Sequence, residues 1–96
     1  MAAITISFKV LPGGLADKAA TYAAVDRAIA VIQRAGLRHL VGPRATTIEG
    51  EYDEVMAAIK QAQQAVRAGA PRVFTQIGID WDPHGSSIDE QLKRYR

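Results

Sequence analysis

Four segments of the chain have the hydrophobic pattern of β-strands. Residues 3–11 alternate, so that one face carries Ile4, Ile6, Phe8 and Val10 and the other carries Thr5, Ser7, Lys9 and Leu11. Residues 72–81 alternate in the same way, which is typical of strands with one buried face. Residues 37–41 and 45–49 are shorter apolar or Thr- and Ile-rich runs that stop at glycine. We expect the first strand to break at Pro12-Gly13-Gly14.

Two longer segments have helical spacing. Residues 15–35 carry an apolar stripe of Tyr22, Val25, Ile29 and Ile32 and end before Gly36. Residues 51–68 carry a second stripe of Val55, Ile59, Ala62 and Val66 and end before Gly69. Glycine directly after a helical run is a common helix terminator. Ser86 or Ser87 is expected to cap a last short helix that continues through Tyr95.

The order of these segments predicts one α+β domain over residues 1–96. Both long helices end in a similar Arg-Ala-Gly sequence that leads into a strand, at residues 34–36 and 67–69. Two strand–helix–strand halves of this kind fit a ferredoxin-like βαββαβ sandwich. We therefore expect a four-stranded antiparallel sheet with two helices on one face, followed by a short C-terminal helix.

Composition excludes several kinds of chemistry. The chain has no cysteine, which rules out disulfides, thiolate metal ligands and cysteine nucleophiles. His39 and His84 are the only histidines, and neither has a metal-ligand partner at a suitable spacing. The serines lie outside any Gly-x-Ser-x-Gly context, and no glycine-rich phosphate loop is present. We expect no metal, no cofactor and no enzymatic activity.

The charge and the N-terminal pattern bear on partners and location. Twelve basic and ten acidic residues give a net charge of +2, and three of the basic residues lie in the last four positions. The basic surface is therefore a property of the tail, and Phe8 points with the core residues, so nucleic-acid binding is not expected. The alternating N-terminus resembles neither a signal peptide nor a membrane helix, which predicts a cytoplasmic protein without a membrane partner.

The sheet face opposite the helices is the candidate site. It would present mainly polar residues, namely Thr5, Ser7, Lys9, Thr47, Glu49, Phe74, Gln76, Gly78 and Asp80, and one chain alone would leave it bare. A solvated surface is the default for such a face. The alternative is a surface that packs against another subunit and holds a small ligand in the gap. Gly78 in mid-strand favours close approach.

Glu49 is the most conspicuous residue of this face. Its carboxylate can accept hydrogen bonds from an aminopyrimidine or balance a cationic ring. The alternative is an exposed strand acid, or an electrostatic partner for the helix that follows it. Trp81, Tyr22 and Tyr52 are expected in core or interface packing rather than in base stacking.

One motif resembles a known family. The run from Gly42 to Val55, with Thr-Thr-Ile-Glu-Gly at its centre, resembles the signature of the small thiamine-binding proteins of the YkoF-like superfamily. The Ala-Gly exits of both helices, Ile79-Asp80 and the C-terminal segment are similar to that family as well. Two positions depart from it: many members carry Met-Gly at Arg44-Ala45 and a lysine at Gly78.

The resemblance implies a binding protein for thiamine or its hydroxymethylpyrimidine moiety. It also implies dimers that pair through strand edges and stack into a homotetramer, with the ligand at a subunit interface. The residues expected to bind the ligand are Glu49, Thr47, Ser7, Gln76 and Phe74. The alternative is an oligomeric regulatory or structural module that senses another small metabolite.

Overall fold

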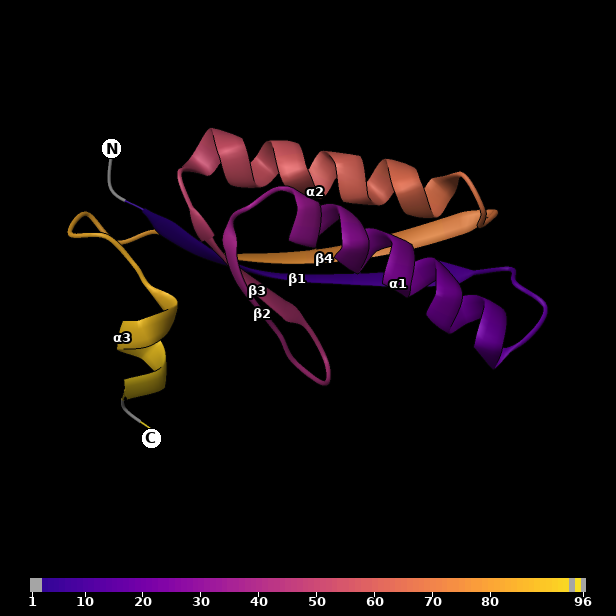
Figure 1. Ribbon diagram of the computed structural model, residues 1–96, viewed down its shortest axis with the longest axis horizontal. Coiled ribbons are helices and arrows are strands. Elements are labelled where there is room, and N and C mark those ends of the chain that lie inside the picture. The colour runs from indigo at the N-terminus through magenta and orange to yellow at the C-terminus, as the bar shows by residue number, and fades with distance from the viewer. Residues whose placement is uncertain (1–2, 94, 96) are drawn as a thin grey trace.

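The computed structural model describes residues 3–93 and Tyr95, and its elements follow the predicted order (Figure 1). They are β1 (Ile4–Gly13), α1 (Lys18–Arg34), β2 (Arg38–Val41), β3 (Thr46–Gly50), α2 (Tyr52–Arg67), β4 (Arg72–Asp80) and α3 (Ile88–Lys93). The four strands form one antiparallel sheet in the order β2-β3-β1-β4. This arrangement confirms the predicted ferredoxin-like fold with a short C-terminal helix.

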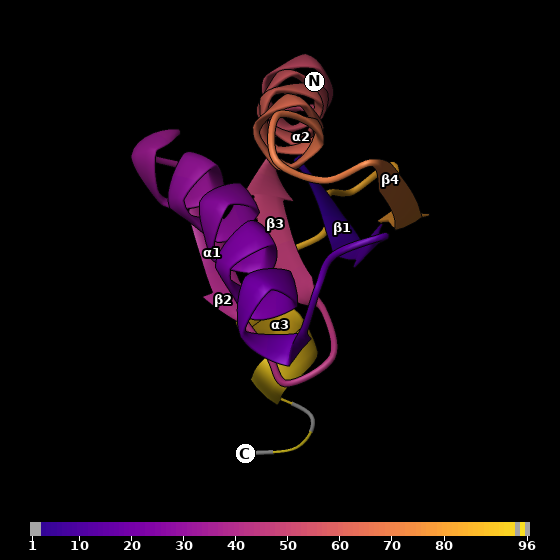
Figure 2. The same cartoon turned by 90° about the vertical axis from the view of Figure 1, so that its right-hand side faces the viewer.

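The long helices pack on one face of the sheet, and α3 lies on the other. In Figures 1 and 2 the sheet separates α2, above it, from α3, below it. The core lies between the long helices and β1 and β3. It includes Ile4, Ile6 and Ile48, which are fully buried. All four residues of the predicted α2 stripe are buried too, which confirms that helix face.

The apolar stripe of α1 differs from the prediction. Ala24, Ala28 and Ile32 are its buried residues, while Val25 and Ile29 are half-buried. Tyr22, expected in the core or an interface, has 57% of its surface exposed and its ring lies 5.6 Å from the Lys18 ammonium. Two of the three buried side chains are alanines, so α1 fills less of the space above the sheet than α2 does.

The first strand is longer than expected, because Pro12 does not end it. Pro12 pairs with Val73 and Gly13 pairs with Arg72, so every residue of β4 has a partner in β1. On its other side, β1 pairs with β3 only as far as Phe8. Proline is tolerated where a strand has an unpaired side, since its missing N–H need not face a neighbour.

The fourth strand is an edge strand, and its apolar residues are less buried than expected. Ile77 and Ile79 pair with Phe8 and Ile6, so they do lie on the helix-covered face. Their side chains are nevertheless 38% and 44% exposed. Trp81, just beyond the strand, is also exposed and stacks on Tyr52 with ring centroids 5.0 Å apart. The edge of β4 is therefore an exposed apolar strip.

Several helix ends follow local rules. Asp17 is the N-cap of α1, and its carboxylate accepts a hydrogen bond of 2.8 Å from the amide of Ala20. Gly36 has a φ of 74°, which suits its predicted place after the helix. Ser87 caps α3 by accepting from the amide of Glu90 at 3.1 Å. The helix ends at Lys93, short of Tyr95, and Arg94 lies outside the described residues.

The sequence suggested that one chain leaves the sheet face opposite the long helices bare. In the structure, one end of this face is covered. The segment after β4 returns across the end of β1 and β3, and Ile88 of α3 is buried there. Thr5 is buried beneath this segment and Glu49 is half-buried. In the described part of the chain, no helix is long and apolar enough to cross a membrane.

Candidate functional site

We call the sheet face opposite α1 and α2 the open face. A shallow polar hollow lies on it, between β1 and β4. Six residues that line it are Thr5, Ser7, Thr47, Gly78, Asp80 and Gln91. A second hollow adjoins it and shares Ser7 and Gly78, while Lys9 and Gln76 extend it along the strands. The polar groups around both hollows are hydroxyls, amides, the Asp80 carboxylate and the Lys9 ammonium. They suit a small polar ligand better than an apolar one.

Gly78 creates the space between the two hollows. It pairs directly with Ser7 across the β1–β4 ladder. A Cβ atom at position 78 would lie 3.1 Å from the Ser7 hydroxyl oxygen. The absence of a side chain therefore leaves this hydroxyl accessible from the open face.

A hydrogen-bond network holds Asp80 in place at one end of the hollow. Ser86 Oγ donates to Asp80 Oδ2 at 3.3 Å, and Gln91 Nε2 donates to the same oxygen at 3.0 Å. Since the Ser86 hydroxyl has one proton, Thr5 Oγ1 must be the donor in its 2.7 Å bond with Ser86 Oγ. Gln91 Nε2 also donates to Thr5 Oγ1 at 2.9 Å.

The network leaves one oxygen of Asp80 open. Both of its bonds end on Oδ2, and Oδ1 has no hydrogen-bond partner among the described residues. An ionised carboxylate has acceptor sites on both oxygens. Asp80 therefore has an acceptor and a negative charge available to a ligand in the hollow.

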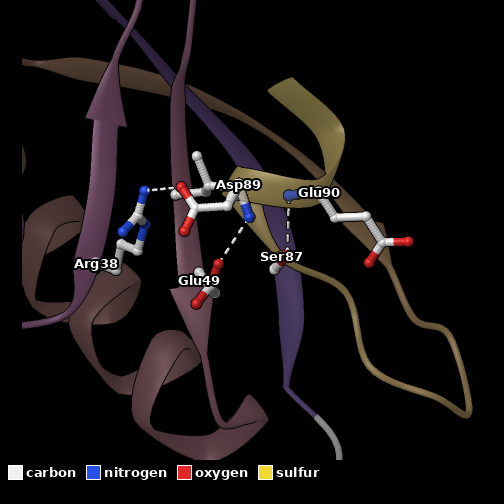
Figure 3. A network of polar contacts seen from close by, with 6 residues as sticks. Arg38, Glu49, Ser87, Asp89 and Glu90 are labelled. Atoms are coloured by element: carbon white, nitrogen blue, oxygen red, sulfur yellow. Dashed lines mark hydrogen bonds and ion pairs between the residues drawn. The ribbon is translucent and has the colours of Figure 1, made fainter. Parts of the chain in front are cut away.

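Glu49 lies outside this hollow, beside the start of α3 (Figure 3). Its Oε1 accepts a hydrogen bond of 2.7 Å from the amide of Ile88. On the adjacent strand, Arg38 forms an ion pair with Asp89. Both side chains point toward the beginning of α3 in Figure 3 and so attach it to the sheet. Glu49 borders a separate depression formed with the 84–87 turn.

The structure brings together three of the five predicted ligand-binding residues. Ser7 and Thr47 share one hollow, and Ser7 and Gln76 share the other. Phe74 is on the same face, opposite Leu11, and is half exposed. It is four residues from Gly78 along β4, which corresponds to about 13 Å. Phe74 and Glu49 thus lie at opposite ends of the face, on either side of the hollows.

Three residues of the hollow were not selected from the sequence. Thr5 and Asp80 were placed on the open face by strand alternation, but nothing in the sequence distinguished them from solvated polar residues. Their pairing in the β1–β4 register is the signal that a correct strand alignment would have supplied. Gln91 reaches the hollow from α3, and strand periodicity cannot predict where that helix docks.

The histidines take local roles. His39 Nδ1 lies 2.9 Å from the carbonyl oxygen of Leu37, and the His84 amide donates to Asp82 at 2.8 Å. Within residues 3–93 and Tyr95, no group of three His, Asp or Glu side chains is placed to hold a metal ion.

Comparison with known proteins identifies the family. The family model described as thiamine-binding protein matches residues 6–96. The chain belongs to this family. A UPF0045 protein of Clostridium perfringens is 33% identical over 92 residues, which cover 95% of each chain. A UPF0045 protein of Synechocystis is 38% identical over 93 residues, which cover 94% of this chain and 74% of the relative.

Solved structures of similar proteins have the same fold. A domain of unknown function from Bacillus cereus superposes with a TM-score of 0.90 at 42% identity, covering 99% of this chain and 91% of that one. A Thermotoga maritima protein, provisionally assigned to thiamine biosynthesis or salvage, has a TM-score of 0.89 at 34% identity. That match covers 98% of this chain and 99% of the Thermotoga chain.

Proposed function

We propose that this protein is a non-enzymatic binding protein for thiamine or its hydroxymethylpyrimidine moiety. The observation that carries the proposal is the match of the thiamine-binding family model to residues 6–96, nearly the whole chain. The polar hollow of the open face supplies a place for such a ligand. The cytoplasmic location remains a prediction from the sequence.

The chemistry of the hollow suits the ligand. An aminopyrimidine offers ring-nitrogen acceptors and an amino donor, which the hydroxyls of Ser7 and Thr47 and the amide of Gln76 can match. The open Oδ1 of Asp80 can accept from the amino group or lie beside the cationic thiazolium of thiamine. We therefore add Asp80 to the predicted set of ligand-binding residues.

The two outer residues of the predicted set would act differently. Glu49 already accepts the Ile88 amide through Oε1, so Oε2 is its oxygen without a hydrogen-bond partner among the described residues. Phe74 is exposed at the far end of the face, where it can offer an apolar contact to the ligand or to another subunit. In this proposal Ser7, Thr47, Gln76 and Asp80 form the centre of the site.

A subunit interface at the edge of β4 is part of the proposal. This strand has nine residues and a neighbour on only one side. An open edge with exposed apolar side chains, here Ile77, Ile79 and Trp81, is suited to pairing with another strand. Since the hollows adjoin β4, a second copy paired there would border the ligand, and two such dimers would make a homotetramer.

A second candidate is an oligomeric module that senses a different small metabolite. The engagement of Glu49 with α3 favours it, because the most conspicuous carboxylate of the family motif is partly satisfied within the chain. A thermal-shift screen of small polar metabolites distinguishes the two functions. Binding to the folded state alone must raise the melting temperature.

Calorimetric titration with thiamine and hydroxymethylpyrimidine tests the first function. We expect saturable binding of at least one of them, with Asp80→Asn weakening thiamine about ten-fold because it removes a charge-assisted contact. Asp82→Asn is the matched control, since Asp82 caps the following turn outside the hollow, and should leave binding unchanged. Light scattering of the same samples reports the subunit number. Absence of heat and of thermal stabilisation at millimolar concentrations of both ligands would rule out the proposal.

A further inference from the structure

A second pocket lies beside the part of β1 that has no β3 partner, under the N-terminal half of α1. It arises because β1 extends to Gly13, whereas its pairing with β3 stops at Phe8. The 42–45 turn between β2 and β3 closes one side of the gap, and α1 spans it from above. The pocket has a volume of about 290 Å³. This is near the lower end of the range for small-molecule sites.

The walls of this pocket are apolar. They include Val10, Leu11, Val25, Ile29, Val41 and Pro43. Val25 and Ile29 are the α1 residues that were expected in the core and are only half-buried. Their exposed surface forms the α1 wall of the pocket. An apolar ligand there would complete the packing of α1 on the sheet.

One polar side chain of the pocket lining is buried. Thr46 lines it and is 94% buried, since its exposed fraction is 6%. Its side chain faces the helices, because it pairs directly with the core residue Phe8. The Thr46 hydroxyl has no hydrogen-bond partner among the described residues, yet it is not sealed from solvent. A ligand in the pocket could therefore supply the partner that this hydroxyl lacks.

The charge around the pocket has one sign. Its lining contains Lys9 and Arg44 and no aspartate or glutamate. Neither cationic side chain forms an ion pair or a hydrogen bond with a described residue. Lys9 also borders the open-face hollow, so Arg44 is the cation that belongs to this pocket alone. A bound anion would meet unpaired positive charge, and a bound cation would be repelled.

We propose that this pocket is a second ligand site, which binds a small apolar carboxylate. The apolar part would lie between β1 and α1, the Thr46 hydroxyl would donate to the ligand, and Arg44 would pair with the carboxylate. This site is distinct from the proposed thiamine site, because α1, β1 and the 41–46 segment supply its lining, and only Lys9 and Ala45 also line the hollow beside Gln76. Its charge also disfavours the thiamine cation, so the two sites select ligands of different chemistry.

A series of probes with one chain length and three charges tests the proposal. Octanoate, 1-octanol and octylammonium are titrated into the isotopically labelled full chain, and amide shifts are followed by NMR. We expect octanoate to bind most tightly and octylammonium least. The shifted amides should cluster in Thr21–Ile29 and in Gly42–Thr46.

Two variants separate the two polar contacts. Arg44→Gln should weaken octanoate about three-fold, as for a solvent-accessible ion pair, and leave 1-octanol unchanged. Thr46→Val keeps the shape of the side chain and should weaken both probes about three-fold through the lost hydrogen bond. Arg34→Gln, at the exposed end of α1, is the matched control and should change neither.

The amide spectrum of each variant shows that it is folded before the affinities are compared. Shifts centred on the β4 edge at Ile77, Ile79 and Trp81 would overturn the proposal, since they would indicate adsorption to exposed apolar surface. Equal binding of octanoate and octylammonium, or no saturation by any probe, would overturn it as well. Thiamine binding is measured independently, so either site can fail without the other.

Discussion

The two faces of the sheet are sealed by different kinds of interaction. On one face, α1 and α2 bury a continuous apolar core, in which Ile4, Ile48 and Val55 have no exposed surface. On the other face, α3 is six residues long and Ile88 is its only buried side chain. Its polar contacts with the sheet include the Ile88–Glu49 and Gln91–Thr5 hydrogen bonds and the exposed Arg38–Asp89 ion pair. Stability therefore depends mainly on the first face.

The difference has a physical origin in what each face can tolerate. Apolar burial is non-directional and strong, at about 25 cal/mol per Å². Polar contacts exchange protein partners for water and contribute only about 1 kcal/mol each. A segment held mainly by such contacts can be displaced at small cost. We therefore expect the α3 end of the open face to adjust when the proposed ligand occupies the hollow beside it.

The largest expected effect is on the helix-covered face. Ile59→Ala removes a side chain of α2 that is 1% exposed, and leaves a cavity in the core. We expect a loss of about 3 kcal/mol in the free energy of unfolding, measured by urea denaturation. The matched variant Ile29→Ala should cost about 1 kcal/mol, because Ile29 is only half-buried and its removal widens an open pocket without creating a closed cavity. Equal losses would contradict the unequal packing of the two helices.

A smaller effect is expected where α3 meets the sheet. Glu49→Ala removes the acceptor of the Ile88 amide and should destabilise the docked helix by about 1.5 kcal/mol. Hydrogen exchange should therefore accelerate in Ile88–Lys93, while the core amides keep their protection. Glu51→Ala is the matched control, because Glu51 caps α2 through the amides of Asp53 and Glu54. Unchanged exchange in α3 would show that Glu49 does not anchor it.

Much of the helix-covered face could be predicted from the sequence. Strand alternation assigned Ile4, Ile6 and Phe8 to the core, and the helical stripe of α2 was correct at every position. These patterns succeed because burial there follows the period of the local structure. The same rule failed for Ile77 and Ile79, since their face was right but their strand lies at the edge of the sheet. Periodicity assigns a residue to one face of the sheet, but it does not show whether the strand has a neighbour on both sides.

The open face was harder to predict, because its polar residues have no periodic signal of their own. Alternation placed Ser7, Thr47 and Gln76 together, and the structure has them around adjoining hollows. The role of Glu49 depends on α3, which starts 39 residues later in the chain and docks through a backbone amide. No side-chain pattern encodes such a contact. The hollow at Asp80 likewise depends on Gln91 from the same helix.

The smallest expected effect on stability is the most informative for the open face. Gly78→Ala places a methyl group 3.1 Å from the Ser7 hydroxyl, which can rotate away because it is exposed. We expect the free energy of unfolding to change by less than about 0.5 kcal/mol. The methyl group would occupy the space shared by both hollows, so thiamine affinity, measured by calorimetry, should fall although the fold is unchanged.

Gly13→Ala provides the comparison for this last variant. Gly13 is also a strand glycine of the β1–β4 ladder, and a Cβ there would meet the Arg72 side chain at an ordinary 3.5 Å. It lines neither hollow, so its replacement should leave thiamine affinity unchanged. If both variants bind thiamine as tightly as the parent chain, the ligand does not use the gap at Gly78. If both lose affinity equally, the loss reflects the strand pair and not the hollow.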